Sequence, residues 1–511
     1  MPSANPERHP ELVFGLVGAL GIDFDPVVGA LQSSLGDVGY EKFHPIRLSD
    51  LLRKFNVWHG NPPSSGLPED VRLERYMTAG DYFRTRAKRG DALVCAAVER
   101  IWEIRKAPPG KLPEGIANCA YILRSLKHPD EVRRLLTLYG PGFLLVGVYL
   151  PEDKQLEKLM RRIADSRRTK QAGQFKNQAQ KLLERDSYDP GTKYGQNVRD
   201  TFALSDVFVD ASDEIRLRKS IERFVEILFS HPSYTPTRDE YGMFHAYAAA
   251  TLSSSLSRQV GASIATSDGE IISLGANEVP KPLGGVYREG DPGEENPEDD
   301  RDFRRGRDSN EFMKNEILVE VFKKLAKDGW LSRRAVPNNV DKIRKELHGT
   351  RLLDLIEFHR ANHAETAALL DAARRGVAVQ GCTLYCTTFP CHNCARHLIA
   401  SGIRRIVYIE PYPKSKAQDF YQKAFTSDPN DDKRICLAPF VGVGPRRFRD
   451  MFSMTTSAGL RIERMNDDGE AIKPEMRKKS LRWGTLETSQ FENEMGVWEV
   501  VKGTFRKLRL K

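Results

Sequence analysis

The sequence predicts an α/β protein with two globular domains and a C-terminal extension. The chain has 511 residues, which is too long for a single hydrophobic core. Short apolar runs of strand length alternate with longer helical segments, and a proline-containing stretch separates two such series. Apolar residues make up 40% of the chain, enough to build ordinary globular cores.

The first domain is predicted to occupy residues 1–230 and to contain a parallel sheet. We expect buried strands at the apolar runs Leu12–Val17, Phe143–Tyr149 and 205–210. We expect helices at residues 91–104, 152–164 and 213–230. Strands that alternate with helices indicate a parallel sheet covered by helices on both faces.

Residues 161–200 of this domain are rich in Arg, Lys, Gln and Asp. Few apolar residues interrupt them, so we interpret the segment as a mobile charged lid or an insertion. Its arginines could close over a phosphate group, and a solvated helical face explains the same charges equally well. The arginines are Arg161, Arg162, Arg167 and Arg168.

A glycine-containing loop, Gly18 to Gly21, directly follows the first predicted strand. In a phosphate-binding P-loop, a lysine and a Ser or Thr follow the second glycine. Counted from Gly18, those positions hold Phe24 and Asp25, and no lysine occurs before Lys42. We expect scaffold or regulation from this loop rather than catalysis, with Gly18 and Gly21 as candidate residues for weak nucleotide binding.

The second domain is predicted at residues 231–455, after a linker at 231–237 whose prolines break helix and sheet. A helix at 238–256 precedes a hairpin whose strands, 260–265 and 271–275, are joined by the turn 267–270. A helix carrying His363, strands at 383–385 and 406–409, and a helix at 391–400 complete a mixed sheet with helices on its faces. Residues 284–310 are expected to form a flexible surface insertion, and the extension 456–511 has no recognisable motif.

One histidine and two cysteines of this domain have the pattern of a zinc site. His363 precedes Cys391 and Cys394, and Pro390 stands directly before the first cysteine. Imidazole and thiolate groups suit zinc, and three protein ligands leave a fourth tetrahedral position for water. Glu365, two residues after the histidine, can move that water's protons as a general base. The order H-x-E, then P-C-x-x-C, is typical of zinc-dependent nucleobase deaminases.

A purely structural zinc site would normally use four protein ligands. Spare histidines and cysteines exist nearby, namely Cys382, Cys386, His359, His392 and His397. We favour a catalytic site because both motifs occur together in the expected order. The two extra cysteines are interpreted as buried apolar residues, and His392 and His397 as surface or packing residues.

The bulk composition limits the compartment and the partners. The net charge of +9 favours anionic partners such as nucleotides or nucleic acid, although the charge could equally be spread over a large surface. Seven cysteines, four of them between Cys382 and Cys394, fit a reduced compartment with a local metal site. No apolar run reaches the length of a membrane span and the N-terminus has no signal-peptide pattern, so we expect a cytoplasmic protein with no membrane partner.

Residues 238–415 resemble the deoxycytidylate deaminase branch of the cytidine deaminase superfamily. The resemblance rests on the run from Arg258 to Ala262, on Gly275 and Asn277 with Pro280, on the two zinc motifs, and on the run from Ser401 to Tyr408. It implies a cytidine deaminase-like α/β/α domain with a mixed sheet and a Zn²⁺ cofactor. It also implies that Asn277 contacts the sugar of a nucleotide, and Arg258 and Lys281 are candidates for contact with phosphate.

Residues 11–454 are similar to the anti-phage dCTP deaminases of bacteria, which join a P-loop kinase-like domain to such a deaminase domain. This resemblance implies conversion of dCTP or dCMP to the uracil nucleotide with release of ammonia. It further implies depletion of deoxycytidine nucleotides in defence against phage, a homo-oligomer, and restraint by a small RNA.

Three other functions stay open at this point. The same zinc chemistry would serve a deaminase of cytidine or adenosine in RNA or single-stranded DNA. A nucleic-acid-binding regulator with a structural zinc is also compatible with the motifs. A nucleotide kinase is disfavoured because the loop at Gly18 lacks its lysine.

Overall fold

The computed structural model divides the chain into two compact units. It describes residues 9–64, 66–106, 115–189, 191–289, 299–332, 340–347, 350–412, 415–456, 459–472, 479, 481–482, 493–497, 500–505 and 508. Unit 1 comprises Met1–Glu240 and Val441–Lys511, and unit 2 comprises Tyr241–Phe440. The chain therefore leaves unit 1 once and returns to it after residue 440.

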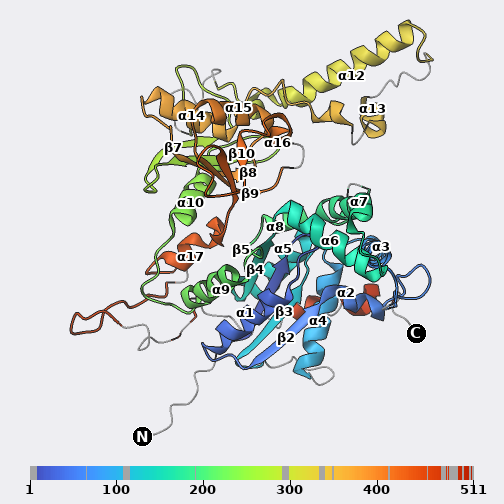
Figure 1. Cartoon of the computed structure of the whole chain (residues 1–511), viewed down its shortest axis with the longest axis vertical. Coiled ribbons are helices and arrows are strands. Elements are labelled where there is room, and N and C mark those ends of the chain that lie inside the picture. Colours follow the sequence, from blue (N-terminus) through green and yellow to red (C-terminus); the bar gives the residue numbers. More distant parts are fainter. Residues whose placement is uncertain are drawn as a thin grey trace. The chain divides into compact units, whose positions relative to one another are not determined.

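Unit 1 is built on a six-stranded sheet with the order β12-β5-β4-β1-β3-β2 (Figure 1). Five strands are parallel, as the sequence predicts, and the two-residue strand β12 joins the edge antiparallel to β5. The strands are β1 (Leu12–Val17), β2 (Lys42–Arg47), β3 (Cys119–Arg124), β4 (Phe143–Tyr149), β5 (Val207–Asp210) and β12 (Gly442–Val443).

Strand β1 lies at the centre of this sheet, between β3 and β4. Leu12 pairs with Ala120 on one side, and Val13 pairs with Phe143 on the other. The chain passes from β1 to β2 and β3 on one side and only then to β4 on the other. Ligands of open α/β sheets bind where the strand order reverses in this way, outside the carboxyl ends of the strands.

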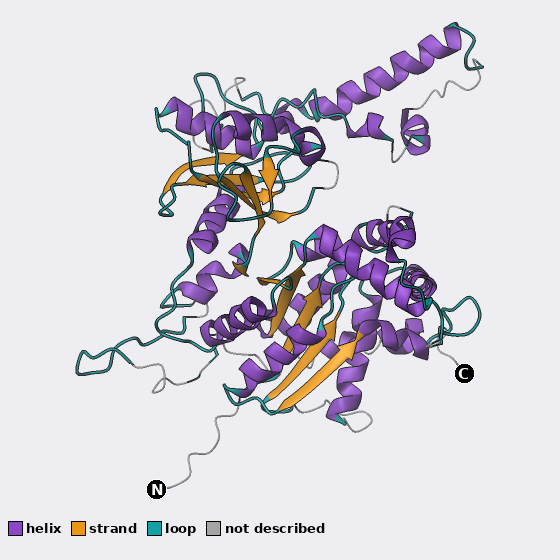
Figure 2. Ribbon diagram, viewed as in Figure 1, coloured by secondary structure: helices purple, strands orange, loops and turns teal. Residues whose placement is uncertain are grey.

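Helices cover both faces of the unit 1 sheet, as Figure 2 shows. Alternation of side chains along the strands creates two cores, since Val13 and Tyr121 belong to one core and Phe14 and Ile122 to the other. The helices are α1 (Asp25–Gly36), α2 (Leu48–Leu51), α3 (Glu69–Ala87), α4 (Ala92–Arg105), α5 (Pro129–Tyr139), α6 (Glu152–Ser166), α7 (Lys176–Ser187), α8 (Val198–Phe202), α9 (Glu214–Leu228) and α17 (Phe448–Phe452). Single turns are η1 (Leu52–Lys54), η2 (Gly140–Gly142), η3 (Ala172–Phe175), η6 (Pro445–Arg447) and η8 (Val501–Phe505).

Four described residues near the C-terminus contribute side chains to the core of unit 1. Val497, Val501, Phe505 and Leu508 are buried in the same core as Val13. Glu494 is fully buried and accepts hydrogen bonds from Arg105 Nη1 and from Trp102 Nε1, each at 2.6 Å. A segment without a recognisable motif is thus an integral part of the first unit.

Unit 2 has a mixed six-stranded sheet with the order β10-β11-β9-β8-β6-β7. Strands β6 and β7 form the predicted hairpin, β6 is antiparallel to β8, and β8, β9, β11 and β10 are parallel. The strands are β6 (Gly261–Ala265), β7 (Ile271–Ala276), β8 (Thr383–Thr388), β9 (Arg405–Glu410), β10 (Phe425–Thr426) and β11 (Ile435–Pro439). The predicted mixed sheet is confirmed.

Helices pack on both faces of this second sheet. Ala364 and Ala368 of α14 and Leu398 of α15 belong to the core under one face. On the other face, Ser263 Oγ of β6 donates a hydrogen bond to the Gly242 carbonyl of α10 at 2.8 Å. The helices are α10 (Arg238–Ala250), α11 (Asp302–Arg305), α12 (Ser309–Lys327), α13 (Val340–Glu346), α14 (Ala364–Arg374), α15 (His392–Ala400) and α16 (Ala417–Phe420), with the single turn η5 (Arg351–Asp354).

Close helix approach explains two glycines of this sheet. A side chain at Gly261 would meet the backbone of Ala246 in α10, and one at Gly275 would meet the backbone of Ala364 in α14. Gly275 therefore lets β7 lie directly against the helix that begins after His363. Packing against α14 therefore explains the glycine at position 275 without any contact with a substrate.

Several predicted elements differ from the observed ones at their ends. The helix predicted at 238–256 ends at Ala250, and the strand predicted at 383–385 continues to Thr388. Of the predicted insertion 284–310, residues 290–298 lie outside the described part, and residues 302–305 form α11. Within the described part of the chain, no helix combines the length and the apolar character that crossing a bilayer requires.

The charged segment 161–200 is largely helical in the structure. The end of α6, then η3 and α7 form a small core of their own with α3, in which Met77, Ile163 and Leu182 are buried. Two of its arginines pair with acidic residues of α3, Arg162 with Glu69 and Arg167 with Asp70. This segment is therefore closer to the predicted solvated helical face than to a mobile insertion.

Candidate metal centre

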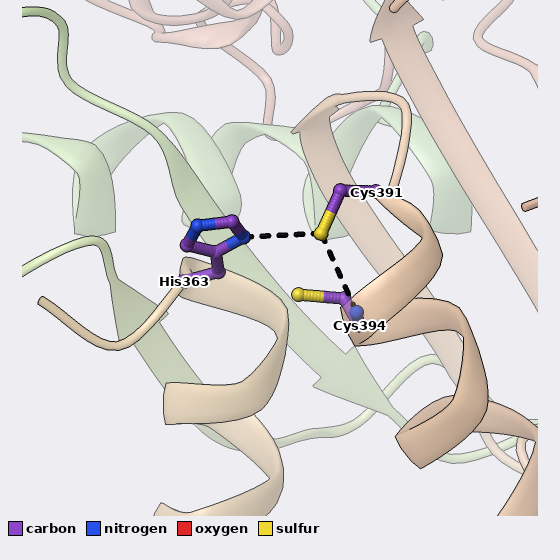
Figure 3. Close-up of side chains that lie close together, drawn as sticks. All are labelled: His363, Cys391 and Cys394. Atoms are coloured by element: carbon purple, nitrogen blue, oxygen red, sulfur yellow. Dashed lines mark hydrogen bonds between the residues drawn. The ribbon is translucent and has the colours of Figure 1, made fainter. Parts of the chain in front are cut away.

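The structure brings His363, Cys391 and Cys394 together in unit 2. The ligand atoms of the three residues all lie within 4.8 Å of one another. His363 Nδ1 lies 3.2 Å from Cys391 Sγ, as Figure 3 shows. The backbone N–H of Cys394 donates to Cys391 Sγ at 3.4 Å. Two segments that are 28 residues apart in the sequence therefore form one cluster.

Two helix starts position the cluster. His363 is the N-cap of α14 and Cys391 is the N-cap of α15. Strand β8 runs between the two helices, and both helices pack on the same face of the sheet. The positive end of a helix dipole stabilises a thiolate, which is the form that binds metal.

The proton distribution of the cluster follows from these contacts. Hydrogen bonds from Cys394 and then from His363 lower the pKa of Cys391 to about 4. The hydrogen bond with Cys391 raises the pKa of His363 to about 9. The hydrogen bond to Cys391 and burial raise the pKa of Cys394 well above its usual value. Without a metal, the cluster therefore holds a thiolate beside an imidazolium and a thiol.

These donors fit a zinc ion. One imidazole and two thiols, with both sulfurs in buried residues, form the donor set that zinc prefers, and the ligand atoms lie close enough to share one ion. A tetrahedral ion held by three protein ligands keeps a fourth position for water, which is the pattern of catalytic sites.

Glu365 lies in the first turn of α14, two residues after His363, and only 4% of it is exposed. Burial raises the pKa of this carboxyl group above its ordinary value. The positive charge of the nearby His363 lowers the pKa of Glu365. A buried carboxyl group with a raised pKa beside the cluster can both accept and return a proton.

Thr366 was not singled out from the sequence, although its hydroxyl lies 3.5 Å from Cys394 Sγ. This contact lowers the pKa of Cys394 and so favours the thiolate form. Partners of metal ligands orient them and tune the metal. Position 366 follows the H-x-E motif directly, and only that spacing could have drawn attention to it.

Asn277 connects the end of β7 to the start of β6. Its Oδ1 accepts a hydrogen bond from Val260 N–H at 2.6 Å, and its Nδ2 donates to the Arg258 carbonyl at 2.9 Å. Its backbone N–H donates to the Val260 carbonyl. The side-chain oxygen and one hydrogen of Nδ2 thus bond to the backbone of residues 260 and 258, and a role in substrate binding stays a prediction.

Arg258 lies at the edge of the sheet where β8 and β9 end. Its Nη1 lies 3.4 Å from Glu410 Oε2, and its guanidinium lies 5.6 Å from the centre of the Tyr412 ring. Thr388 Oγ1 also lies 3.4 Å from Glu410 Oε2. The positive charge of Arg258 lowers the pKa of His363, which places it within electrostatic range of the cluster.

Lys281 lies in a groove with a volume of about 850 Å³ beside β7 and α14. The groove is also lined by Arg288, Arg374 and Leu370, whereas the three cluster residues are not among its lining residues. Contact of Lys281 with a phosphate stays a prediction.

Gly18 and Gly21 lie in unit 1, at the carboxyl end of β1. A side chain at Gly18 would meet the carbonyl oxygen of Val148 at 2.8 Å, and Gly21 has a φ of +91°. Packing and backbone conformation thus account for both glycines. Their role in nucleotide binding stays a prediction.

Part of the chain is similar to known proteins. Residues 236–410 match the model of the cytidine and deoxycytidylate deaminase zinc-binding region. A deoxycytidylate deaminase of Enterobacteria phage T2 is 48% identical over 54 residues, which are 11% of this chain and 29% of the relative. The ComE operon protein 2 of Bacillus subtilis (strain 168) is 35% identical over 73 residues, 14% of this chain and 39% of the relative. The chain thus spans well under half the length of these relatives.

A solved structure, the dCMP deaminase from cyanophage S-TIM5 in apo form, is 16% identical to this chain. It covers 40% of this chain and 100% of its own, with a TM-score of 0.21. The family match and the His/Cys/Cys cluster together identify residues 236–410 as a zinc-binding domain of the deaminase type and confirm the predicted zinc cofactor.

Proposed function

We propose that this protein catalyses the hydrolytic deamination of deoxycytidine nucleotides, on the premise that residues 236–410 form a deaminase-type zinc domain. One observation carries the proposal. The ligand atoms of three candidate zinc ligands lie within 4.8 Å of one another, and the buried carboxyl group of Glu365 lies in the first turn of the helix that one of them caps. This arrangement could hold a metal ion with an open coordination position beside a proton carrier.

When bound, zinc lowers the pKa of a coordinated water molecule toward neutrality and thereby supplies a nucleophile at physiological pH. The Glu365 carboxylate accepts a proton from the attacking water and passes it to N3 of the cytosine ring. A new bond forms between the water oxygen and C4, and the C4–N4 bond then breaks. Glu365 then takes the second proton from the new hydroxyl group on C4 and gives it to the departing nitrogen, so that ammonia leaves and a uracil ring remains.

The proposed substrate class is supported by the relatives and by the resemblance at Asn277. The similar proteins from phage T2 and from Saccharomyces cerevisiae are both named deoxycytidylate deaminase. The resembling enzymes place an asparagine against the sugar. Asn277 holds residues 258 and 260 in a fixed conformation, and its Nδ2 has a second hydrogen for a ligand.

Incubation of the purified full chain with each cytosine ribonucleotide and deoxyribonucleotide tests the proposal. We expect ammonia release and a change of +1 Da in the mass of the deoxycytidine nucleotides, which reflects the replacement of NH by O. Zinc content is measured in the same preparation. Intact nucleotides in the presence of one bound zinc per chain would contradict the proposal.

A competition assay tests the main alternative, deamination of a base within RNA or single-stranded DNA. A cytosine-containing oligonucleotide and dCMP are supplied together at equal cytosine concentration. We expect dCMP to react first, since the domain is similar to enzymes of free nucleotides. Faster reaction of the oligonucleotide would favour the alternative.

We further propose that dCTP and dCMP are both substrates and that their deamination limits phage replication in the cytoplasm. It is supported by the resemblance to anti-phage deaminases, which combine an α/β domain with a deaminase domain. We expect cells that express the wild type to lose dCTP upon infection, whereas cells that express Glu365→Ala keep it. Equal dCTP levels in both would contradict this role.

A homo-oligomer and restraint by a small RNA belong to the same proposal and rest on the same resemblance. Light scattering coupled to size exclusion is expected to give a mass above that of one 57.8 kDa chain. Sequencing of RNA that copurifies with the protein is expected to recover one enriched small RNA. A monomer without enriched RNA would remove this part of the proposal.

A further inference from the structure

The loop after β1 in unit 1 lies next to a buried carboxylate. Asp186, in the last turn of α7, is 1% exposed. Its Oδ2 accepts a hydrogen bond from the backbone N–H of Leu20 at 2.8 Å. Residues 20 and 186 are 166 positions apart, so this contact joins two distant segments.

Lys127 completes the surroundings of this carboxylate. Its Nζ lies 2.8 Å from Asp186 Oδ1 and 3.0 Å from Oδ2. The same ammonium group donates to the Gly18 carbonyl at 3.3 Å. Both side chains are largely buried, with side-chain exposures of 16% for the lysine and 1% for the aspartate. The ion pair therefore lies in an environment where charges interact strongly.

The donors around Asp186 are of the kind that a glycine-rich loop offers to an external anion. Such a loop presents backbone N–H groups and a lysine to a phosphate at the carboxyl end of a parallel strand. Here Leu20 supplies the N–H group, and Lys127, which comes from the segment after β3, supplies the ammonium group. The sequence pattern misses this lysine because it lies outside the loop.

The helices α6 and α7 close over the same loop. The Leu20 side chain packs against the core that Leu159, Ile163 and Leu182 form between these helices and α3. The Gln155 carbonyl of α6 lies 3.0 Å from where a side chain at Gly21 would begin. Arg185, next to Asp186, is held by Asp81 of α3 at 2.8 Å.

We propose that Asp186 is an internal ligand that fills an oxyanion site formed by Leu20 N–H and Lys127. By filling the site, it holds α6 and α7 over the loop without an external nucleotide. An external phosphate and Asp186 compete for the same donors, so the site becomes available only when this carboxylate leaves. Asp25 at the start of α1 and Asp23 two residues before it add negative charge shortly after the loop, and Asp25 is paired with Arg124.

Replacement of the carboxylate tests the proposal on the full chain. Asp186→Ala removes the internal ligand and leaves Lys127 without its ion pair. We expect inorganic phosphate, compared with chloride at equal ionic strength, to raise the Tm of Asp186→Ala by about 2–4 °C more than that of the wild type. The wild type serves as the control for the general stabilisation that phosphate gives folded proteins.

The double variant Asp186→Ala/Lys127→Ala is the matched control. We expect the additional phosphate effect to disappear in it, because the ammonium group of the site is absent. An equal phosphate effect in the wild type and in Asp186→Ala would overturn the proposal. An additional effect that persists without Lys127 would also overturn it, since the anion would then bind elsewhere.

Asp186→Asn is the second variant and applies if the alanine variant does not fold. Its amide oxygen can still accept from Leu20 N–H, while the negative charge is lost. Hydrogen exchange followed by mass spectrometry reports on peptides that cover residues 18–24 and 152–187. We expect faster exchange of both peptides in Asp186→Asn than in Asp189→Asn, a neighbouring control that removes the charge paired with Arg185 and keeps an amide oxygen for Gly191 N–H. Equal exchange in both variants would contradict the role of Asp186.

Discussion

His363 Nδ1 lies 3.2 Å from Cys391 Sγ, and each residue caps the start of a separate helix of unit 2. This contact places an imidazolium beside a thiolate, because it raises the pKa of the histidine to about 9 while the pKa of the cysteine falls to about 4. The imidazole ring of His363 therefore holds a proton that must leave before this residue can bind a metal ion.

We expect zinc binding at pH 7 to release about two protons, one from His363 and one from the Cys394 thiol. Cys391 contributes none, because its pKa of about 4 makes it a thiolate already. Zinc affinity therefore rises with pH between about 5 and 8, by about a hundredfold per unit. Calorimetry in buffers of different ionisation enthalpy measures the number of protons. Release of no protons would show that the ligands are already deprotonated.

Glu365→Gln is expected to lower the deamination rate by about 10²–10⁴-fold, because the amide cannot carry protons between water, ring and leaving group. Metal analysis should still find zinc, since the three ligand residues are unchanged. Glu270→Gln, in the exposed turn between β6 and β7, is the control and should keep full activity. Retained activity in Glu365→Gln would assign the proton transfers to another group.

Thr366→Val is expected to weaken zinc binding by about 10–100-fold. The valine keeps the shape of the side chain but removes the hydroxyl that lies 3.5 Å from Cys394 Sγ and favours its thiolate. Competition with a chromophoric chelator measures the affinity. Thr366→Ser keeps the hydroxyl and should bind zinc like the wild type. Equal affinities of the valine and serine variants would exclude this role.

Asn277→Ala is expected to destabilise unit 2 by about 1–3 kcal/mol, because Val260 N–H and the Arg258 carbonyl lose their partner. Thermal unfolding measures this loss. Asn277→Asp keeps the acceptor for Val260 and should retain more stability than the alanine variant. If the aspartate variant is stable but has a raised KM for dCMP, the side-chain amide of Asn277 contributes to substrate binding. An unchanged KM would limit Asn277 to its structural role.

Glu240→Ala is expected to destabilise unit 1 by about 3–5 kcal/mol. The carboxylate is fully buried and binds both Nη atoms of Arg223 at 2.8 Å. It also accepts from Val443 N–H, where the chain returns to the unit, and from Thr237 N–H. Urea unfolding followed by near-UV circular dichroism measures the change. A double variant with Arg223→Ala should lose less than the sum of the two single variants, because the pair is coupled.

Much of the fold could be predicted because short apolar runs in the sequence indicate its buried strands. The runs at Leu12–Val17 and Phe143–Tyr149 are apolar throughout and became the central strands of the first sheet. Strand β2 was missed, since it is an edge strand with Pro45 and several polar residues. Strand β12 has only two residues and exists because the chain returns to pair with β5. No local pattern signals such a pairing.

The metal site was predictable for a chemical reason. Few residue types bind zinc, and His363, Cys391 and Cys394 occur at a spacing that few other sites share. Thr366 and the pair of Arg258 and Glu410 were not predictable as partners, because a hydroxyl or a charged side chain has many alternative roles. Their contacts depend on where β8, β9 and α14 place them.

The sequence by itself predicted the metal, the three residues that the structure brings together and Glu365 as the candidate proton carrier, because coordination chemistry restricts which side chains can serve. Only the tertiary structure decided that Asp186 and Lys127 meet at the loop after β1, and that residues 441–511 return to the first unit. Partners 59 or 166 positions apart are brought together by the packing of whole helices on a sheet. That packing depends on many weak contacts along the chain, and no single sequence motif predicts it.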